Sequence, residues 1–141
     1  MITGDQKQQY LDLFNKGLTL DLELADLKML TELDVNGEPN AVAGFFNSSQ
    51  YNIEGAIASK QGWSGNKSFA IACFDYAFVR CEAWRMTCYV RASNAQSIMF
   101  QERLGFKREF DGVLKNWFGS EDGIQFVMFK NECKWLKETK K

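Results

Sequence analysis

The chain has no histidine among its 141 residues. Ser-His-Asp and Cys-His catalysis, histidine-ligated metals and imidazole acid–base chemistry are therefore excluded. The four cysteines have no C-x-x-C spacing. This spacing argues against zinc ribbons and thioredoxin-like redox sites, and we expect no metal site.

Long apolar runs are missing as well. No stretch approaches the roughly 20 apolar residues of a membrane-spanning helix. The polar start, MITGDQKQQY, lacks the features of a secretory signal. We therefore expect a cytoplasmic protein with no membrane partner. In that reducing compartment the cysteines would be free thiols, with Cys73 and Cys88 buried as small core residues.

An excess of one charge is also absent. The chain has 17 basic and 18 acidic side chains, and its net charge of −1 gives no argument for a nucleic-acid partner. The distribution is nevertheless uneven. Residues 1–40 carry eight acidic and three basic side chains, and the remainder carries ten acidic and fourteen basic ones. An anionic ligand would bind the second part, although the asymmetry is equally compatible with chance.

What is present is the composition of one globular domain, residues 1–141, with 45% hydrophobic and 25% charged residues. Periodicity and turn residues divide it into elements, and residues 18–30 fit either a strand or a helix. The expected elements are a helix at 6–16 stopped by Gly17, a hairpin of 30–35 and 41–46 around Asn36-Gly37, a strand at 51–59, a helix at 68–83, a strand at 85–91, a helix from Ser93 or Asn94 to Leu104 stopped by Gly105, and strands at 106–110, 113–118 and 124–129. This order predicts an α/β fold with helices flanking a mixed sheet.

The loop at 60–67, KQGWSGNK, joins a predicted strand to a predicted helix. A helix N-terminus presents unpaired N–H groups and a partial positive charge, and glycines before it let a phosphate approach closely. Such a cradle would consist of Gln61, Gly62, Ser64, Gly65, Asn66 and Lys67, with Lys60 adding charge. By itself such a loop is more often an ordinary connection, and it has neither the P-loop nor the G-x-G-x-x-G pattern.

A second segment, NAQSIMFQERLGF at Asn94–Phe106, reads as a helix capped by Asn94 and ended by Gly105. Together with the strand–loop–helix unit before it and the strands after it, this segment resembles the N-x-x-A/S…E-K-L-G-F signature of the GNAT N-acetyltransferase superfamily. The segments at 74–78 and 132–136 resemble phage and bacterial members. The resemblance covers about residues 30–136.

The resemblance implies a GNAT-like acyl-CoA N-acyltransferase fold: a mixed, mostly antiparallel sheet flanked by helices. That sheet would split between the strands at 51–59 and 85–91. Acetyl-CoA, the co-substrate, would insert in the split. The protein would transfer acetyl by direct attack of a primary amine, whose carrier, a small molecule or a protein, stays open. A homodimer is also left open.

The resemblance also implies roles for particular residues. Backbone N–H groups at Ile57, Ala58 and Ser59 would polarise the thioester carbonyl. Residues 61–67, with Trp63 among them, would hold the pyrophosphate. Asn94 would contact the pantetheine arm or cap the helix beside it.

Glu54 lies on the strand that leads into the loop, where superfamily members often carry a glutamate. By the resemblance it would be the catalytic base, taking a proton through water from the attacking ammonium, since only the neutral amine is nucleophilic. The alternative is an exposed glutamate on the polar face of an ordinary strand.

Three positions in two segments differ from the superfamily pattern. The pyrophosphate loop usually reads Q/R-x-x-G-x-G/A; Gln61 matches, whereas Ser64 and Asn66 stand where glycines are usual. Many members also carry a tyrosine that protonates the leaving thiolate, and Gln101 occupies that position. We assign Gln101 to cofactor binding. A thiol with a pKa of roughly 8.5 needs only modest acid help to leave.

These differences favour an alternative function, a catalytically silent GNAT-fold interaction module, with a phage left open as its source. The Asn94–Phe106 signature favours the enzyme, although that helix would also be retained for the fold alone.

Overall fold

The computed structural model describes residues 1–139, which form one eight-stranded sheet with helices on both faces. The strand order is β1-β2-β3-β4-β5-β8-β6, and β7 pairs with β8. The strands are β1 Ile2–Thr3, β2 Lys28–Leu33, β3 Pro39–Phe46, β4 Asn52–Ser59, β5 Arg85–Arg91, β6 Lys107–Arg108, β7 Leu114–Phe118 and β8 Glu121–Phe129. The helices are α1 Gln8–Leu18, α2 Lys67–Asp75, α3 Ala95–Leu104 and α4 Lys134–Thr139.

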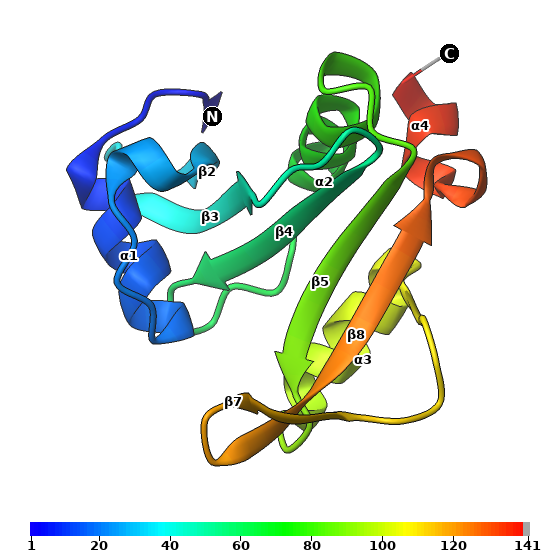
Figure 1. The fold of residues 1–141 in the computed structure, drawn as a ribbon. Helices are drawn as coiled ribbons and strands as arrows, with labels where there is room; N and C mark the ends of the chain where they lie inside the picture. Colours follow the sequence, from blue (N-terminus) through cyan, green and yellow to red (C-terminus); the bar gives the residue numbers. More distant parts are fainter. Residues whose placement is uncertain (140–141) are drawn as a thin grey trace.

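The helices cover the two faces unequally (Figure 1). On one face, α1 packs against β2, β3 and β4 through Tyr10, Leu11 and Phe14. On the other face, α2, α3 and α4 pack over a larger core drawn from both halves of the sheet. No described helix lies over β5 and β8 on the α1 side, and we call this surface the open face.

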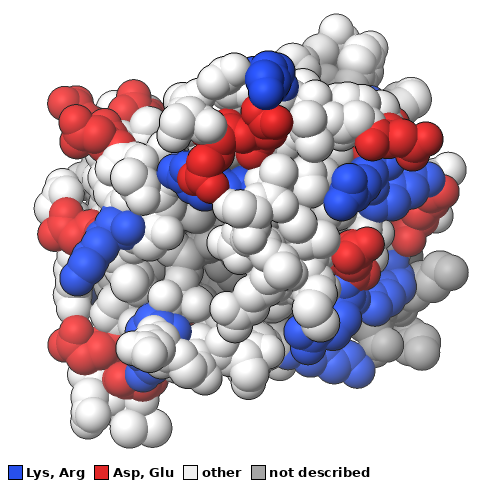
Figure 2. Space-filling model, turned by 90° about the horizontal axis from the view of Figure 1, so that it is seen from below, with Lys and Arg blue, Asp and Glu red and all other residues white. Residues whose placement is uncertain are grey.

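The β4 and β5 strands are parallel and pair over three residues, from Asn52–Arg85 to Glu54–Thr87. Beyond this point β4 remains paired with β3, and β5 with β8, so the two halves of the sheet part (Figure 1). Seen from the end toward which both strands point, the surface is hollowed near its centre (Figure 2). The other strand pairs among residues 1–139 are antiparallel. The expected sheet and its expected split are therefore confirmed.

Local signals are confirmed in several elements. The hairpin of β2 and β3 forms around Gly37, which has a φ of 81°. Its loop is longer than two residues because the Asp34 carboxylate accepts the N–H groups of Asn36 and Glu38. Asn94 caps α3, and Gly105 ends it with a φ of 110°.

The expected stop of the first helix at Gly17 is wrong. Helix α1 runs to Leu18 and ends at Thr19, which adopts a left-handed φ of 55°. Gly17 instead marks the close approach of α1 to β4: a Cβ there would lie 2.8 Å from the Cβ of Ala58. The glycine therefore serves packing, which the local sequence does not reveal.

Other boundaries also differ. The helix expected at 68–83 is α2 followed by a π-helical turn, Tyr76–Arg80, and Glu82 then has a φ of 56°. The ambiguous region before β2 forms a short 3₁₀ turn, Leu24–Asp26. The sequence patterns did not predict β1, which adds to the edge of β2, or α4, which forms in the basic tail.

Candidate active site

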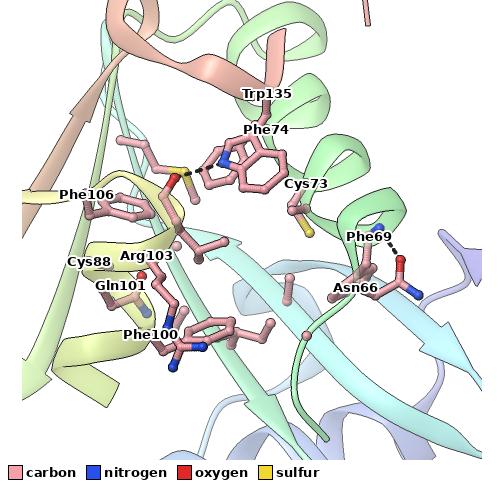
Figure 3. A pocket seen from close by; sticks show the side chains of 18 of the residues that line it. Asn66, Phe69, Cys73, Phe74, Cys88, Phe100, Gln101, Arg103, Phe106 and Trp135 are labelled. Carbon is pink, nitrogen blue, oxygen red and sulfur yellow. Dashed lines mark hydrogen bonds between the residues drawn. The ribbon is translucent and has the colours of Figure 1, made fainter. Parts of the chain in front are cut away.

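A cavity of about 710 Å³ lies on the α2 face where β4 and β5 part. Apolar side chains supply most of its wall, and α2 and α3 face one another across it (Figure 3). Its lining includes Ala43 and Phe45 of β3, Gly55 and Ile57 of β4, Met86 and Cys88 of β5, Phe69, Cys73 and Phe74 of α2, Phe100, Gln101 and Arg103 of α3, and Trp135 of α4. The cavity thus follows the split from the start of α2 to the α3–α4 contact.

The predicted phosphate loop forms one end of this cavity. Trp63, Ser64, Gly65, Asn66 and Lys67 line it. The Asn66 side chain caps α2 by accepting the N–H of Phe69 at 3.1 Å. Gly65 has a φ of 106°, a conformation that favours glycine.

Free backbone donors are available at this end. The N–H groups of Ser64, Gly65 and Ser68 donate to no other residue among 1–139. They lie at or beside the N-terminus of α2, where the helix dipole favours an anion. The loop therefore has the donors of an anion cradle, although Ser64 and Asn66 replace the usual glycines.

Gln61 and Gly62 border a different space. They line a second hollow of about 440 Å³ on the other side of the loop, together with Glu32, Asp34 and Lys60. The loop residues Trp63 to Asn66 separate this hollow from the main cavity, since they line both.

Trp63 is anchored by a residue that sequence reasoning did not find. Its indole Nε1–H donates to the Glu32 carboxylate at 2.7 Å, and Glu32 is only 6% exposed. The Trp63 ring also packs against Phe69 and Phe100. No local pattern joins Glu32 to the loop, because the two are brought together by the pairing of β2, β3 and β4.

The edge of β4 also presents backbone N–H donors to the gap that opens between β4 and β5 where the two strands part. The N–H of Lys60 bonds to the carbonyl of Asn40 on β3. Since hydrogen-bonding direction alternates along a strand, Ala58 also faces β3, while Ile57 and Ser59 direct their N–H groups into the gap beside β5. Of the three expected carbonyl-polarising residues, Ile57 and Ser59 have the required direction.

Gln101 faces the cavity from α3 (Figure 3). It is 8% exposed, and its amide makes no hydrogen bond with another described residue. A buried amide in this state offers both a donor and an acceptor to a ligand. Asn94, by contrast, lies outside the cavity lining; its side chain accepts the N–H of Ser97 at 3.1 Å, which is the capping role.

Glu54 lies on the opposite side of the sheet from the cavity. Its carboxylate accepts the Asn47 amide at 3.1 Å and forms no ion pair among residues 1–139. Burial raises the pKa of Glu54 above its usual range, against the opposing effect of the Asn47 hydrogen bond. Its residue pair with Thr87 is the last before the strands part, so the carboxylate lies beside the gap.

Solved structures share this fold, although no protein-family model and no curated protein matches the sequence. Spermidine/spermine N-acetyltransferase SpeG from Vibrio cholerae, solved with manganese ions, superposes with a TM-score of 0.75 at 11% identity, covering 99% of this chain and 96% of that one. N-acetyltransferase PseH from Campylobacter jejuni, solved in complex with acetyl coenzyme A, gives 0.62 at 16% identity, with 92% and 99% covered. Ribosomal-protein-S5-alanine acetyltransferase from Vibrio fischeri gives 0.64 at 15% identity, with 89% and 69% covered.

The chain has the GNAT N-acetyltransferase fold. This confirms the resemblance carried by residues 94–106 and the fold it implied. Identities this low establish the fold and leave the acceptor open. A phage source finds no support in these bacterial structures.

Within this GNAT fold, Arg103 is a further residue of interest. It lines the cavity, is exposed, and forms no ion pair with another described residue. Lys134 donates to the Arg103 carbonyl at 3.2 Å and adds a second positive charge to the same rim. The signature segment contained this arginine, but its sequence alone did not place the side chain at the cavity.

No three His, Cys, Asp or Glu residues within 1–139 come together to hold a metal ion. No described helix has both the length and the apolar character needed to cross a membrane. The four cysteines are free, as expected; Cys73, Cys88 and Cys133 are buried, and Cys81 is exposed.

Proposed function

We propose that the protein is an acetyl-CoA-dependent N-acetyltransferase that acetylates a primary amine. One observation supports this most strongly. The parting of β4 and β5 opens a 710 Å³ cavity on the α2 face and leaves Glu54 at the same point on the opposite face. A thioester held in the cavity and an amine on the other side would meet in the gap.

The residues around the cavity fit acetyl-CoA. The free N–H groups of Ser64, Gly65 and Ser68 would bind the pyrophosphate at the start of α2. The N–H groups of Ile57 and Ser59 would bind the extended pantetheine arm or polarise the thioester carbonyl. The Gln101 amide would bind the same arm from α3. PseH, which shares the fold, was solved in complex with acetyl coenzyme A, and this supports the choice of co-substrate.

The chemistry is a direct transfer. Glu54 takes a proton, through water, from the ammonium, and the neutral nitrogen attacks the thioester carbonyl carbon. The carbon–sulfur bond breaks and CoA leaves as a thiolate, which takes a proton from solvent. The nitrogen releases its second proton to solvent as the amide forms. Because burial raises the pKa of Glu54, this carboxylate is a stronger base than an ordinary glutamate.

One observation favours a second candidate, a catalytically silent GNAT-fold interaction module. Gln101 provides no titratable proton for the leaving thiolate. Acetyl-CoA binding without acetylation of any amine would support this module.

The test is a calorimetric titration of acetyl-CoA, followed by assay of free-thiol release against a panel of amines. We expect saturable binding and amine-dependent thiol release. Gly65→Ala should weaken binding, because Gly65 has positive φ at the cradle. Gly37→Ala is the matched control: it imposes similar backbone strain in the β2–β3 loop and should leave affinity unchanged. No heat at millimolar acetyl-CoA would refute the proposal.

A further inference from the structure

Two aromatic rings stack on the open face beside the gap. The rings of Tyr89 on β5 and Trp117 on β7 lie 4.6 Å apart between centroids and 24° from parallel. Trp117 lies over Gly123 of β8. A Cβ added at Gly123 would lie 2.9 Å from the Trp117 Cβ. Trp117 remains 49% exposed, so its ring forms a surface wall.

This aromatic pair lies on the same face as Glu54. Tyr89 follows Thr87 by two residues, and Thr87 pairs with Glu54, so all three side chains point to one side of the sheet. Burial raises the pKa of Tyr89, and the nearby Glu54 charge raises it further. The carboxylate and the rings therefore flank the same end of the gap.

Two other carboxylates on the open face, those of Glu109 and Glu121, are already neutralised by arginines. Arg85 binds Glu109, which also accepts the Gln125 amide. Arg91 binds Glu121 at 2.6 Å. Glu54 has the Asn47 amide as its partner and no cation among residues 1–139. Glu54 thus offers a carboxylate with no cation partner among the described residues, beside the aromatic pair.

We infer that the acceptor is an arylalkylamine, an amine with one positive charge and an aromatic ring. Resting on the proposed function, this assignment places the ammonium at Glu54 and the ring against Tyr89 and Trp117. Stacking and cation–π attraction favour such a ligand. A polyamine would require several unpaired carboxylates, because each further ammonium loses water on binding. The paired state of Glu109 and Glu121 makes a polyamine the poorer ligand.

The experiment compares three amines with acetyl-CoA: 2-phenylethylamine, n-butylamine and spermidine. We expect kcat/KM for 2-phenylethylamine to exceed both others by about tenfold or more, from ring burial and stacking. Trp117→Ala should lower kcat/KM for 2-phenylethylamine about tenfold and change that for n-butylamine by less than about twofold. Trp84→Ala is the matched control, because Trp84 is 68% exposed and its ring packs at a tilt against Tyr51 at the opposite end of the strands. It should change neither value.

A second measurement needs no turnover. Calorimetric binding of 2-phenylethylamine to the protein, with and without CoA, should be stronger than that of n-butylamine and should weaken in Trp117→Ala. This result would support the inference even if acetyl-CoA failed to bind. Failure of acetyl-CoA to bind would refute the proposed function and leave the preference for an aromatic amine standing. Preference for spermidine, or equal behaviour of the wild type and Trp117→Ala toward 2-phenylethylamine, would overturn the inference even in an active enzyme.

Discussion

Glu54 and Thr87 form the last residue pair that joins β4 to β5. Both side chains point to the face opposite the cavity, and the strands part immediately beyond them. This pair therefore marks the position where a thioester on one face would become accessible to an amine on the other. The consequences for Glu54 can be measured in two ways.

Glu54→Gln should lower kcat/KM by about 10²–10⁴-fold near neutral pH, because the amide retains the shape but cannot accept a proton. Since the pKa of Glu54 is raised, the acidic limb of the wild-type profile should lie above the range of an ordinary glutamate. The variant should lose this limb and recover partly at alkaline pH, while acetyl-CoA affinity stays unchanged. Superimposable pH–rate profiles for the two proteins would remove the base assignment.

The raised pKa of Glu54 also predicts a stability effect. The folded state holds this proton more tightly than the unfolded chain does, so the residue's favourable contribution is lost as the pH rises through the folded-state pKa. Glu54→Gln should therefore gain stability relative to wild type as the pH increases, and the two should converge in acid. Urea unfolding across a pH series measures this difference; a constant difference would contradict it.

Gly17→Ala should destabilise the protein although alanine is the better helix former. The added methyl would lie 2.8 Å from the Cβ of Ala58, which is fixed to the β4 backbone. Overpacking of this kind costs about 1–3 kcal/mol. The double variant Gly17→Ala/Ala58→Gly should recover much of the lost melting temperature, because it removes the opposing methyl. If the single variant melts at or above the wild-type temperature, the close approach of α1 and β4 is wrong.

Gly105→Val should also lower the melting temperature. Gly105 ends α3 with a φ of 110°, and a Cβ there would lie 3.4 Å from the Met128 methyl. A β-branched residue in this conformation should cost about 1 kcal/mol or more. Chemical denaturation gives the free energy of unfolding, and an unchanged value would count against the left-handed conformation at this position.

Thiol titration should distinguish the four cysteines. Under denaturing, non-reducing conditions all four should react, since none forms a disulfide. In the native protein Cys81 should react first, because it is exposed, whereas burial protects Cys73 and Cys88 and raises the pKa of both thiols. Bound acetyl-CoA should slow Cys73 and Cys88 further, since both line the cavity. Fast reaction of all four native thiols would contradict this burial.

The sequence by itself determined the elements whose signals are local. Asn94 and Gly105 bracket α3 because a cap and a left-handed stop act within one helical turn. The alternation of residues 85–91 likewise predicted the bounds and buried face of β5, since side chains of a strand alternate between its faces. The signature at 94–106 extended these local elements to a GNAT-like fold and its split sheet.

Only the tertiary structure decided which residues meet at the site. Trp63 reaches Glu32, and Tyr89 reaches Trp117, across strands that are distant in sequence, so no local pattern encodes either contact. The same holds for Gly17, whose local context indicates a helix stop but whose place over Ala58 makes it a packing residue. Composition and residue spacing determine where helices, strands and turns form. Strand pairing then brings residues that are distant in sequence into contact, and this creates the cavity, the aromatic pair and the position of the Glu54 carboxylate between them.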